Sequence, residues 1–157
     1  MIIRIVYSLF IGVLLATFVG VGIAAFYPAP ERPEYPVELS VPQTKAQEES
    51  PEIRAQRIEQ EKKQRDFQKL DEKYNKNVSI IAVVAAIAVL VVSLTLLRHI
   101  LIIADGLLLG GVFTLIYSII RGFVTNDNQF RFVVVTIGLI TALTLGYLKF
   151  VKTTRKK

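Results

Sequence analysis

Asp105 is the residue of this chain best placed to do chemistry inside a membrane, because it is the only acidic residue between Glu72 and Asp127. Much of that stretch is apolar, and an ionisable group in such surroundings is commonly a proton or cation site. Thr114 and Ser118 follow it and could add hydroxyl groups to a narrow polar track. The carboxylate could instead cap the start of a helix at the membrane interface by accepting hydrogen bonds from backbone N–H groups. We expect the cap, with the ion or proton site as the alternative.

The residue types do not favour other reaction chemistry. The chain has no cysteine and one histidine, His99, which excludes thiolate ligands and histidine-rich metal sites. Because His99 follows Arg98 at the end of an apolar segment, we expect it to be an interfacial turn residue. Residues 126–128 (Asn-Asp-Asn) lack the glycine and closing glutamate of a calcium loop and predict a polar loop. We therefore predict a protein that is not an enzyme and holds no metal or cofactor.

Small residues recur at every fourth position in three apolar segments. A four-residue step keeps side chains near one helix face, and small side chains let another helix backbone approach closely. In lipid this close approach is a main source of helix association, so the rows predict helix-packing faces. The rows are Gly12, Ala16, Gly20 and Ala24; Gly106, Gly110, Thr114, Ser118 and Gly122; and Gly138, Ala142 and Gly146.

The elements that carry these rows are predicted to be transmembrane helices. Of the 157 residues, 52% are hydrophobic, and the apolar residues are segregated from the charged ones. Residues 5–30 contain no charge, whereas residues 45–77 are mostly charged or amide-bearing. Such segregation indicates membrane spans plus one polar excursion. The predicted fold is an all-α, four-span transmembrane helical bundle with a long polar helix projecting from the membrane between spans 1 and 2.

The predicted spans are 1–27, 78–100, 106–124 and 131–150, the last three forming a bundle with a basic C-terminal tail. The first is longer than the apolar core of a signal peptide, and no A-x-A site follows it, which favours an uncleaved anchor. In the fourth, the flanking Arg131 and Lys149 are expected to extend outward toward the interfaces.

The third span allows two registers, because too few uncharged residues separate Asp105 from Arg121 for an upright crossing. In the first, the turn lies at Arg98–His99 and Asp105 is carried into the membrane. In the second, the turn lies at residues 104–106 and the helix continues to about Val124. The second is favoured because it uses Asp105 as an N-cap, which satisfies donors that lipid cannot.

The excursion between spans 1 and 2 has two parts. Residues 28–50 are rich in proline, which predicts an extended linker. Residues 51–77 predict a charged helix that begins after a Ser50 cap and continues into span 2, since no glycine or proline interrupts it. Glu59 and Lys63 are among its acid-before-base pairs at four-residue spacing. Its first 25 or so residues would project about 38 Å beyond the membrane.

The charge pattern and the packing faces suggest partners. The net charge of +6 is concentrated in a juxtamembrane tail that fits anionic lipid, and we expect no binding to nucleic acid. Flanking charges at span 1 and the basic C-terminus favour both termini in the cytoplasm, in a bacterial plasma membrane.

The expected function is a non-enzymatic assembly, scaffold or accessory subunit that binds other membrane proteins or itself. The alternative is a small transporter or channel component that uses Asp105 with Thr114 and Ser118. The basic residues of the juxtamembrane C-terminal tail are Lys149, Lys152, Arg155, Lys156 and Lys157.

Overall fold

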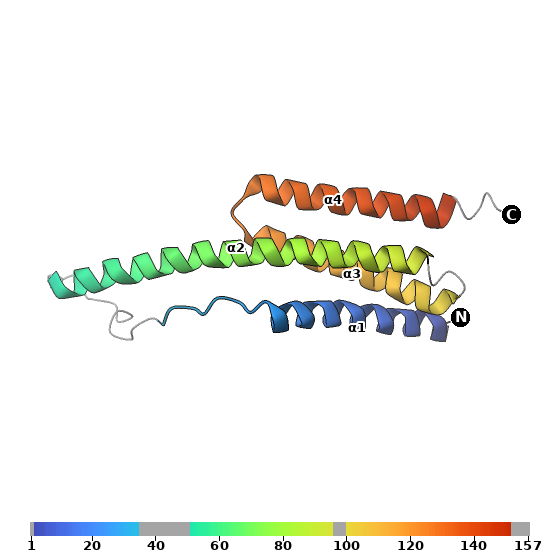
Figure 1. Ribbon diagram of the computed structural model, residues 1–157, viewed down its shortest axis with the longest axis horizontal. Coiled ribbons are helices and arrows are strands. Elements are labelled where there is room, and N and C mark those ends of the chain that lie inside the picture. The colour runs from blue at the N-terminus through green and yellow to red at the C-terminus, as the bar shows by residue number, and fades with distance from the viewer. Residues whose placement is uncertain (1, 35–50, 96–99, 152–157) are drawn as a thin grey trace. The chain divides into compact units, whose positions relative to one another are not determined.

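The computed structural model describes residues 2–34, 51–95 and 100–151. In this part of the chain all regular structure is helical, and four helices are long and apolar enough to cross a membrane (Figure 1). The protein is therefore an all-α bundle of the multi-pass membrane class. Its helices are α1 (Ile2–Phe26), α2 (Pro51–Thr95), α3 (Leu101–Val124) and α4 (Asn128–Gly146), and α4 continues as a π-helical turn, η2 (Tyr147–Val151).

The chain divides into two compact units. The bundle unit comprises Met1–Pro28 and Asn75–Lys157, and the charged unit comprises Ala29–Tyr74. Helix α2 contributes to both, and it is unbroken from Pro51 to Thr95 because no glycine or proline follows Pro51 within it. The expected Ser50 cap and most of the proline-rich linker lie outside the described residues, as do Arg98 and His99.

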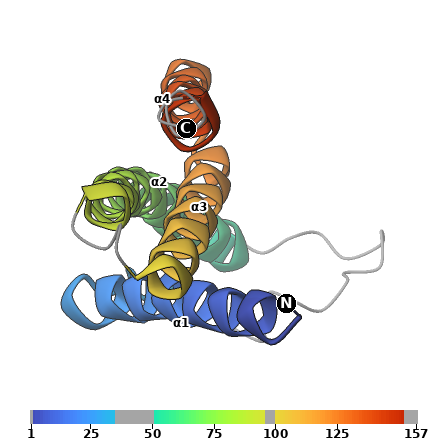
Figure 2. The same ribbon diagram turned by 90° about the vertical axis from the view of Figure 1, so that its right-hand side faces the viewer.

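Helix α3 is the central element of the bundle unit, in contact with each of the other three helices. Gly110 lies against Leu15 of α1, and Gly111 lies against Leu90 of α2. On the remaining side, Ile119 lies against Gly138 of α4. Figure 2 shows α3 between α1 and α4. Consistent with this arrangement, 39% of the residues in the apolar stretch of α3 are buried, compared with 11% in the apolar stretches of α1 and α4.

The core is built on one face of the membrane-spanning part of α2. Its fully or nearly fully buried residues recur at every fourth position, at Val78, Ala82, Ala86 and Leu90. Ala88, on another face of the same helix, is exposed. The small side chains allow α2 to approach α3 closely, and Ala86 and Leu90 form one hydrophobic cluster with leucines of α3 and α4.

Helix α4 begins one turn earlier than the sequence predicts, at Asn128 instead of residue 131. The cause is Asp127, whose side chain accepts a hydrogen bond from the Phe130 N–H and so caps the helix. The earlier start gives a continuous helical segment from Asn128 to Lys149 of 22 residues, which is long enough to cross a membrane.

Candidate functional site

Asp105 does not cap α3, so the predicted register for the third span is wrong at its start. The helix begins at Leu101 with Ile100 in the capping position, and no side chain there accepts a hydrogen bond from the helix. Asp105 instead lies within the helix, more than one turn from its start. The predicted end near Val124 agrees with the structure.

The Asp105 carboxylate pairs with a cation, and not with the backbone N–H groups that the capping hypothesis predicts. The Lys149 Nζ donates to the Asp105 carboxylate across the gap between α3 and η2. Both side chains are partly exposed, so the pair lies at the margin of the bundle and not in its core. Lys149 was expected to extend outward from the end of span 4. The pair arises because α3 and α4 are antiparallel neighbours, which places the end of one beside the start of the other (Figure 1).

The Asp105–Lys149 pair lies in a groove between α1, α3 and α4. The groove has a volume of about 620 Å³ and is open along part of its surface. Aliphatic side chains form most of its wall, while Arg4 and Ser8 add polar groups from the first turns of α1. The apolar lining comprises Ile5, Leu101, Ile102, Leu108, Leu109, Val112, Ala142, Leu145 and Gly146.

Thr114 and Ser118 are not brought together with Asp105. At about 100° per residue, both lie on the opposite side of α3 from the carboxylate. The Thr114 hydroxyl donates to Gly110 O of its own helix at 2.8 Å. Ser118 donates to Ser79 O on α2 at 2.8 Å, and the Ser79 hydroxyl donates back to Ser118 O at 2.9 Å. These hydroxyl groups are buried in helix contacts, and the polar track suggested by the sequence does not form from them.

The small-residue row on α3 contacts two helices in succession. A four-residue step rotates by about 40° more than a full turn, so the row winds slowly around the helix. At its start, a Cβ on Gly106 would lie 2.8 Å from Ile11 of α1. Toward its end, a Cβ on Gly122 would lie 3.2 Å from the Ser79 hydroxyl of α2. The row therefore provides close approach for α1 first and, after winding about 160° around the helix axis, for α2.

Only part of the row on α1 packs against another helix. Gly12 is buried, and a Cβ there would lie 3.2 Å from Gly110 N and 3.3 Å from Gly106 O. Ala16 is half-buried, and a Cβ on Gly20 would meet nothing within 4 Å. Ala24 is exposed.

The row on α4 shows the same division. Gly138 is buried, with Ile119 of α3 at 3.1 Å from a Cβ placed on it. Ala142 is exposed, and a Cβ on Gly146 would meet nothing within 4 Å. Both residues line the groove instead of contacting a helix.

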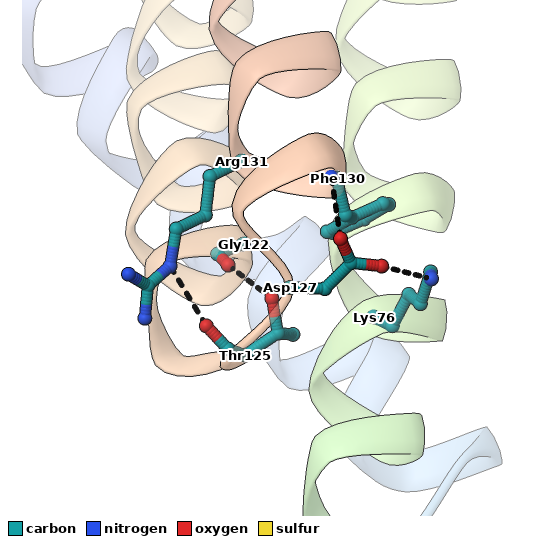
Figure 3. Close-up of polar contacts among 6 residues, drawn as sticks. All are labelled: Lys76, Gly122, Thr125, Asp127, Phe130 and Arg131. Carbon is teal, nitrogen blue, oxygen red and sulfur yellow. Dashed lines mark hydrogen bonds and ion pairs between the residues drawn. The ribbon is translucent and has the colours of Figure 1, made fainter.

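A cluster of polar contacts, which the sequence did not predict, joins the opposite end of the bundle. The Asp127 carboxylate accepts from Phe130 N at 3.0 Å and from Lys76 Nζ of α2 at 3.0 Å (Figure 3). The Arg131 Nε donates to Thr125 O of the loop at 2.7 Å, so the side chain is directed toward the loop end of the bundle. An acidic residue just before an apolar helical pattern is a cap signal, and that signal was available in the sequence.

Two more contacts tie helices together at this end. Arg121 donates to the Asn75 amide oxygen at 3.0 Å, which links α3 to α2. Asn77 donates to the Tyr27 hydroxyl at 2.8 Å, which links α2 to the end of α1.

Asp127 is the titratable group of this cluster with a shifted pKa. The Phe130 N–H and then the Lys76 ammonium stabilise its charged form, and together they lower the pKa of the carboxyl below its usual value. The group lies in the loop between α3 and α4 and is exposed. Its contacts fasten the loop to α2 and are structural in character.

The charged unit presents mostly solvated side chains. Glu59 and Lys63 form the ion pair that their spacing predicts, at 2.8 Å. Lys63 lowers the pKa of the Glu59 carboxyl, first by its hydrogen bond and then by its charge. Arg32 and Pro33, which precede the helix in the chain, lie beside Phe67 around a pocket of about 110 Å³.

Comparison with known proteins adds no relative. A scan against protein-family models, a search of curated proteins and a search of solved structures each found no match. Within the described residues, no three histidine, cysteine or acidic side chains are grouped so that they could hold a metal ion. The groove around Asp105 and the charged helix are the two features on which a function can be argued.

Proposed function

We propose that this protein is a non-enzymatic integral membrane protein that serves as an assembly, scaffold or accessory subunit. The observation that carries this proposal is that α2 is one unbroken helix with two chemically opposite parts. From Val78 onward it contributes buried side chains to the bundle, whereas most side chains between Pro51 and Tyr74 are exposed and many are charged. A helix that is polar on nearly every face is typical of a segment that bridges to another component.

The charges of this segment favour a protein partner over a nucleic acid. Residues 51–74 contain seven basic and six acidic side chains, so the two signs nearly cancel. A phosphate backbone would select a surface of one sign. Interspersed charges of both signs provide specificity in protein contacts, where each charge can oppose its counterpart.

The outer face of α1 supports association within the membrane. Gly20 and Ala24 on α1 have room around them, and such positions allow a partner helix to approach closely. In the proposed topology both termini face the cytoplasm of a bacterial plasma membrane. The charged helix then binds its partner on the extracytoplasmic side.

Photo-crosslinking in intact cells tests this proposal. A photoreactive amino acid at Gln68 should capture a defined protein, identified by mass spectrometry. The same capture should be lost when residues 51–74, apart from the photoreactive residue at position 68, are replaced by a Gly/Ser linker of equal length. A matched photoreactive residue at Leu139, on the outer face of α4, controls for general membrane proximity. A protein that purifies alone, with no product crosslinked specifically from Gln68, contradicts the proposal.

The alternative function is a small transporter or channel component centred on Asp105. The groove supports it, because an ionisable pair beside a cavity is a common arrangement at ion and proton sites. The contacts of Thr114 and Ser118 within and between helices weigh against a continuous polar track from Asp105. Asp105→Asn separates the two functions. It should abolish proton-coupled flux in a transporter and leave capture from Gln68 unchanged in an assembly subunit.

A further inference from the structure

We propose that the groove between α1, α3 and α4 is a binding site for one anionic membrane lipid, with an acyl chain along its wall and the headgroup at Arg4 and Lys149. The wall is aliphatic, and the charged groups Arg4, Asp105 and Lys149 all belong to helix segments at one end of the bundle. This proposal goes beyond the assembly function and does not depend on it.

The dimensions of the groove suit an alkyl chain. Its lining residues on α3 run from Leu101 to Val112, a length of about 17 Å at 1.5 Å per residue. An alkyl chain fits, because aliphatic carbons contact their neighbours at about 4 Å.

The volume is also that of a ligand site. Pockets for small ligands typically measure about 300–1,000 Å³, and they combine apolar walls with a few polar groups that fix orientation. Here the wall is made by small or aliphatic residues, among them Ala142 and Gly146, which leave the groove wide because alanine has only a methyl side chain and glycine has none. Larger residues at these two positions would fill it.

The charges at the groove favour a negatively charged headgroup. Two cations, Arg4 and Lys149, line the groove with one anion, Asp105, which leaves a net positive charge. Asp105 binds Lys149 and holds it beside the groove. Arg4 forms no ion pair within the described part of the chain, so its guanidinium is available to a phosphate. Anionic headgroups are attracted to basic residues at a membrane surface, in agreement with this arrangement.

Filling the groove tests the site of the acyl chain. Full-length protein is purified in mild detergent, and binding of phosphatidylglycerol is measured by native mass spectrometry. Gly146→Leu should weaken binding by about tenfold or more, because the new side chain takes the place of about three methylene groups of the lipid. Gly20→Leu is the matched control, since it adds the same side chain at an open position outside the groove. It should leave binding within about twofold of the wild type.

Changing the charge tests the site of the headgroup and remains informative if Gly146→Leu fails to fold. The wild type should bind phosphatidylglycerol more tightly than phosphatidylcholine with the same acyl chains. Arg4→Gln should reduce that preference by about tenfold, the effect of losing one charge-assisted hydrogen bond. Lys62→Gln removes the same charge from the charged unit and should leave the preference unchanged.

Three outcomes overturn the proposal. One is equal binding of the two lipids by the wild type. Another is an unchanged preference in Arg4→Gln. The third is a crosslink to a peptide from a photoreactive residue at Ala142, because a protein helix would then occupy the groove. The proposal predicts that this residue crosslinks to lipid. Loss of the protein captured from Gln68 has no bearing on these measurements, so the failure of one proposal is distinguishable from that of the other.

Discussion

At the scale of single residues, serine hydroxyl groups on α1 and α2 bond to backbone carbonyls of α3. A helical side chain covers the turn that precedes its own Cα, so a glycine leaves the carbonyls of that turn accessible. Gly106 and Gly122 stand four residues after two of the accepting carbonyls. The small residues of α3 therefore permit hydrogen bonds as well as close packing. The bonds are Ser8 Oγ to Ile102 O at 3.2 Å, Ser79 Oγ to Ser118 O at 2.9 Å and Ser93 Oγ to Ala104 O at 2.6 Å.

The reciprocal Ser79–Ser118 bonds should be worth a measurable amount of stability. Ser79→Ala and Ser118→Ala should each destabilise the bundle, and a double-mutant cycle should give a coupling of about 0.6 kcal/mol, up to about 1.7 kcal/mol. Unfolding in mixed micelles with increasing SDS measures these values. Thr17→Val is the control, because the Thr17 hydroxyl is exposed and bonds only to Val13 O on its own helix. Strictly additive effects of the two alanine substitutions would show that the bonds are not coupled.

Asp127 should stabilise the bundle as the N-cap of α4. Asp127→Ala removes the acceptor for Phe130 N–H and the partner of Lys76, so the Tm in detergent should fall by a few degrees. The Tm of the Asp127→Asn variant should fall less, because asparagine caps a helix as well as aspartate does. Equal effects of the two substitutions would assign the contribution to the ion pair instead of the cap.

The same residue should make the stability depend on pH. Its pKa is lower in the folded protein than in the unfolded chain, so its stabilising effect is fully present above the unfolded pKa near 3.8. The effect is lost as the pH falls through the folded pKa. The difference in Tm between wild type and Asp127→Asn should therefore shrink when thermal unfolding is measured below pH 3.8. A difference that stays constant from neutral to acid pH would contradict this assignment.

At the scale of elements, the contact between α1 and α3 depends on glycine in both helices. Gly12 meets the backbone of α3 at residues 106 and 110, both of which are also glycines. Farther along α1 the row no longer meets another helix, because Gly20 has open space around it. One continuous row of small residues thus serves internal packing at one end and leaves the other end uncovered by the described bundle.

Gly12→Ala should therefore be more harmful than the same change at Gly20. At Gly12 the added Cβ would lie 2.9 Å from Leu109 Cβ and close to two backbone atoms that cannot move independently. We expect a loss of about 1–3 kcal/mol, as for other overpacked contacts. Gly20→Ala should be neutral or slightly stabilising, because alanine is the better helix former. Unfolding in SDS mixed micelles compares the two, and equal effects would place Gly12 outside a close contact.

At the scale of the whole molecule, lipid replaces water as the solvent for most of the chain. The outer faces of α1 and α4 consist largely of exposed aliphatic and aromatic side chains, among them Phe18 and Phe132. Such a surface would aggregate in water, whereas in a bilayer it is simply solvated. The polar contacts are consequently found between helices and at the loop end, where they tie neighbouring helices together. Helix α2 is shared by the bundle unit and the charged unit.

The proposed topology can be tested directly because the chain contains no cysteine. Gln60→Cys and Gln129→Cys should react with a membrane-impermeant maleimide in intact cells. Arg155→Cys should react only after the cells are permeabilised. The reverse pattern would place the termini outside the cytoplasm, and labelling of Gln60→Cys and Gln129→Cys on opposite sides would contradict four spans.

The fold could be read from the sequence because it depends on one-dimensional properties. Segregated hydrophobicity and segment length predict four apolar helices, and the lack of glycine or proline after Pro51 predicts a long second helix. The candidate site could not be read in the same way. In the sequence Asp105 resembles a cap, because nothing in the order of residues indicates that Lys149 lies within reach of it. The loop-end cluster was missed for a similar reason, since Lys76 and Asp127 are 51 residues apart in sequence.

The sequence by itself determined that this chain is a multi-pass helical membrane protein with one polar excursion, because solvent preference and helix length are properties of contiguous residues. The tertiary structure alone decided which residues meet. It places the small-residue row of α3 against both α1 and α2, leaves Gly146 beside a groove, and brings Lys149 into contact with Asp105. The physical reason is that these contacts depend on the rotation and neighbours of each helix, which are set by the packing of all four helices together.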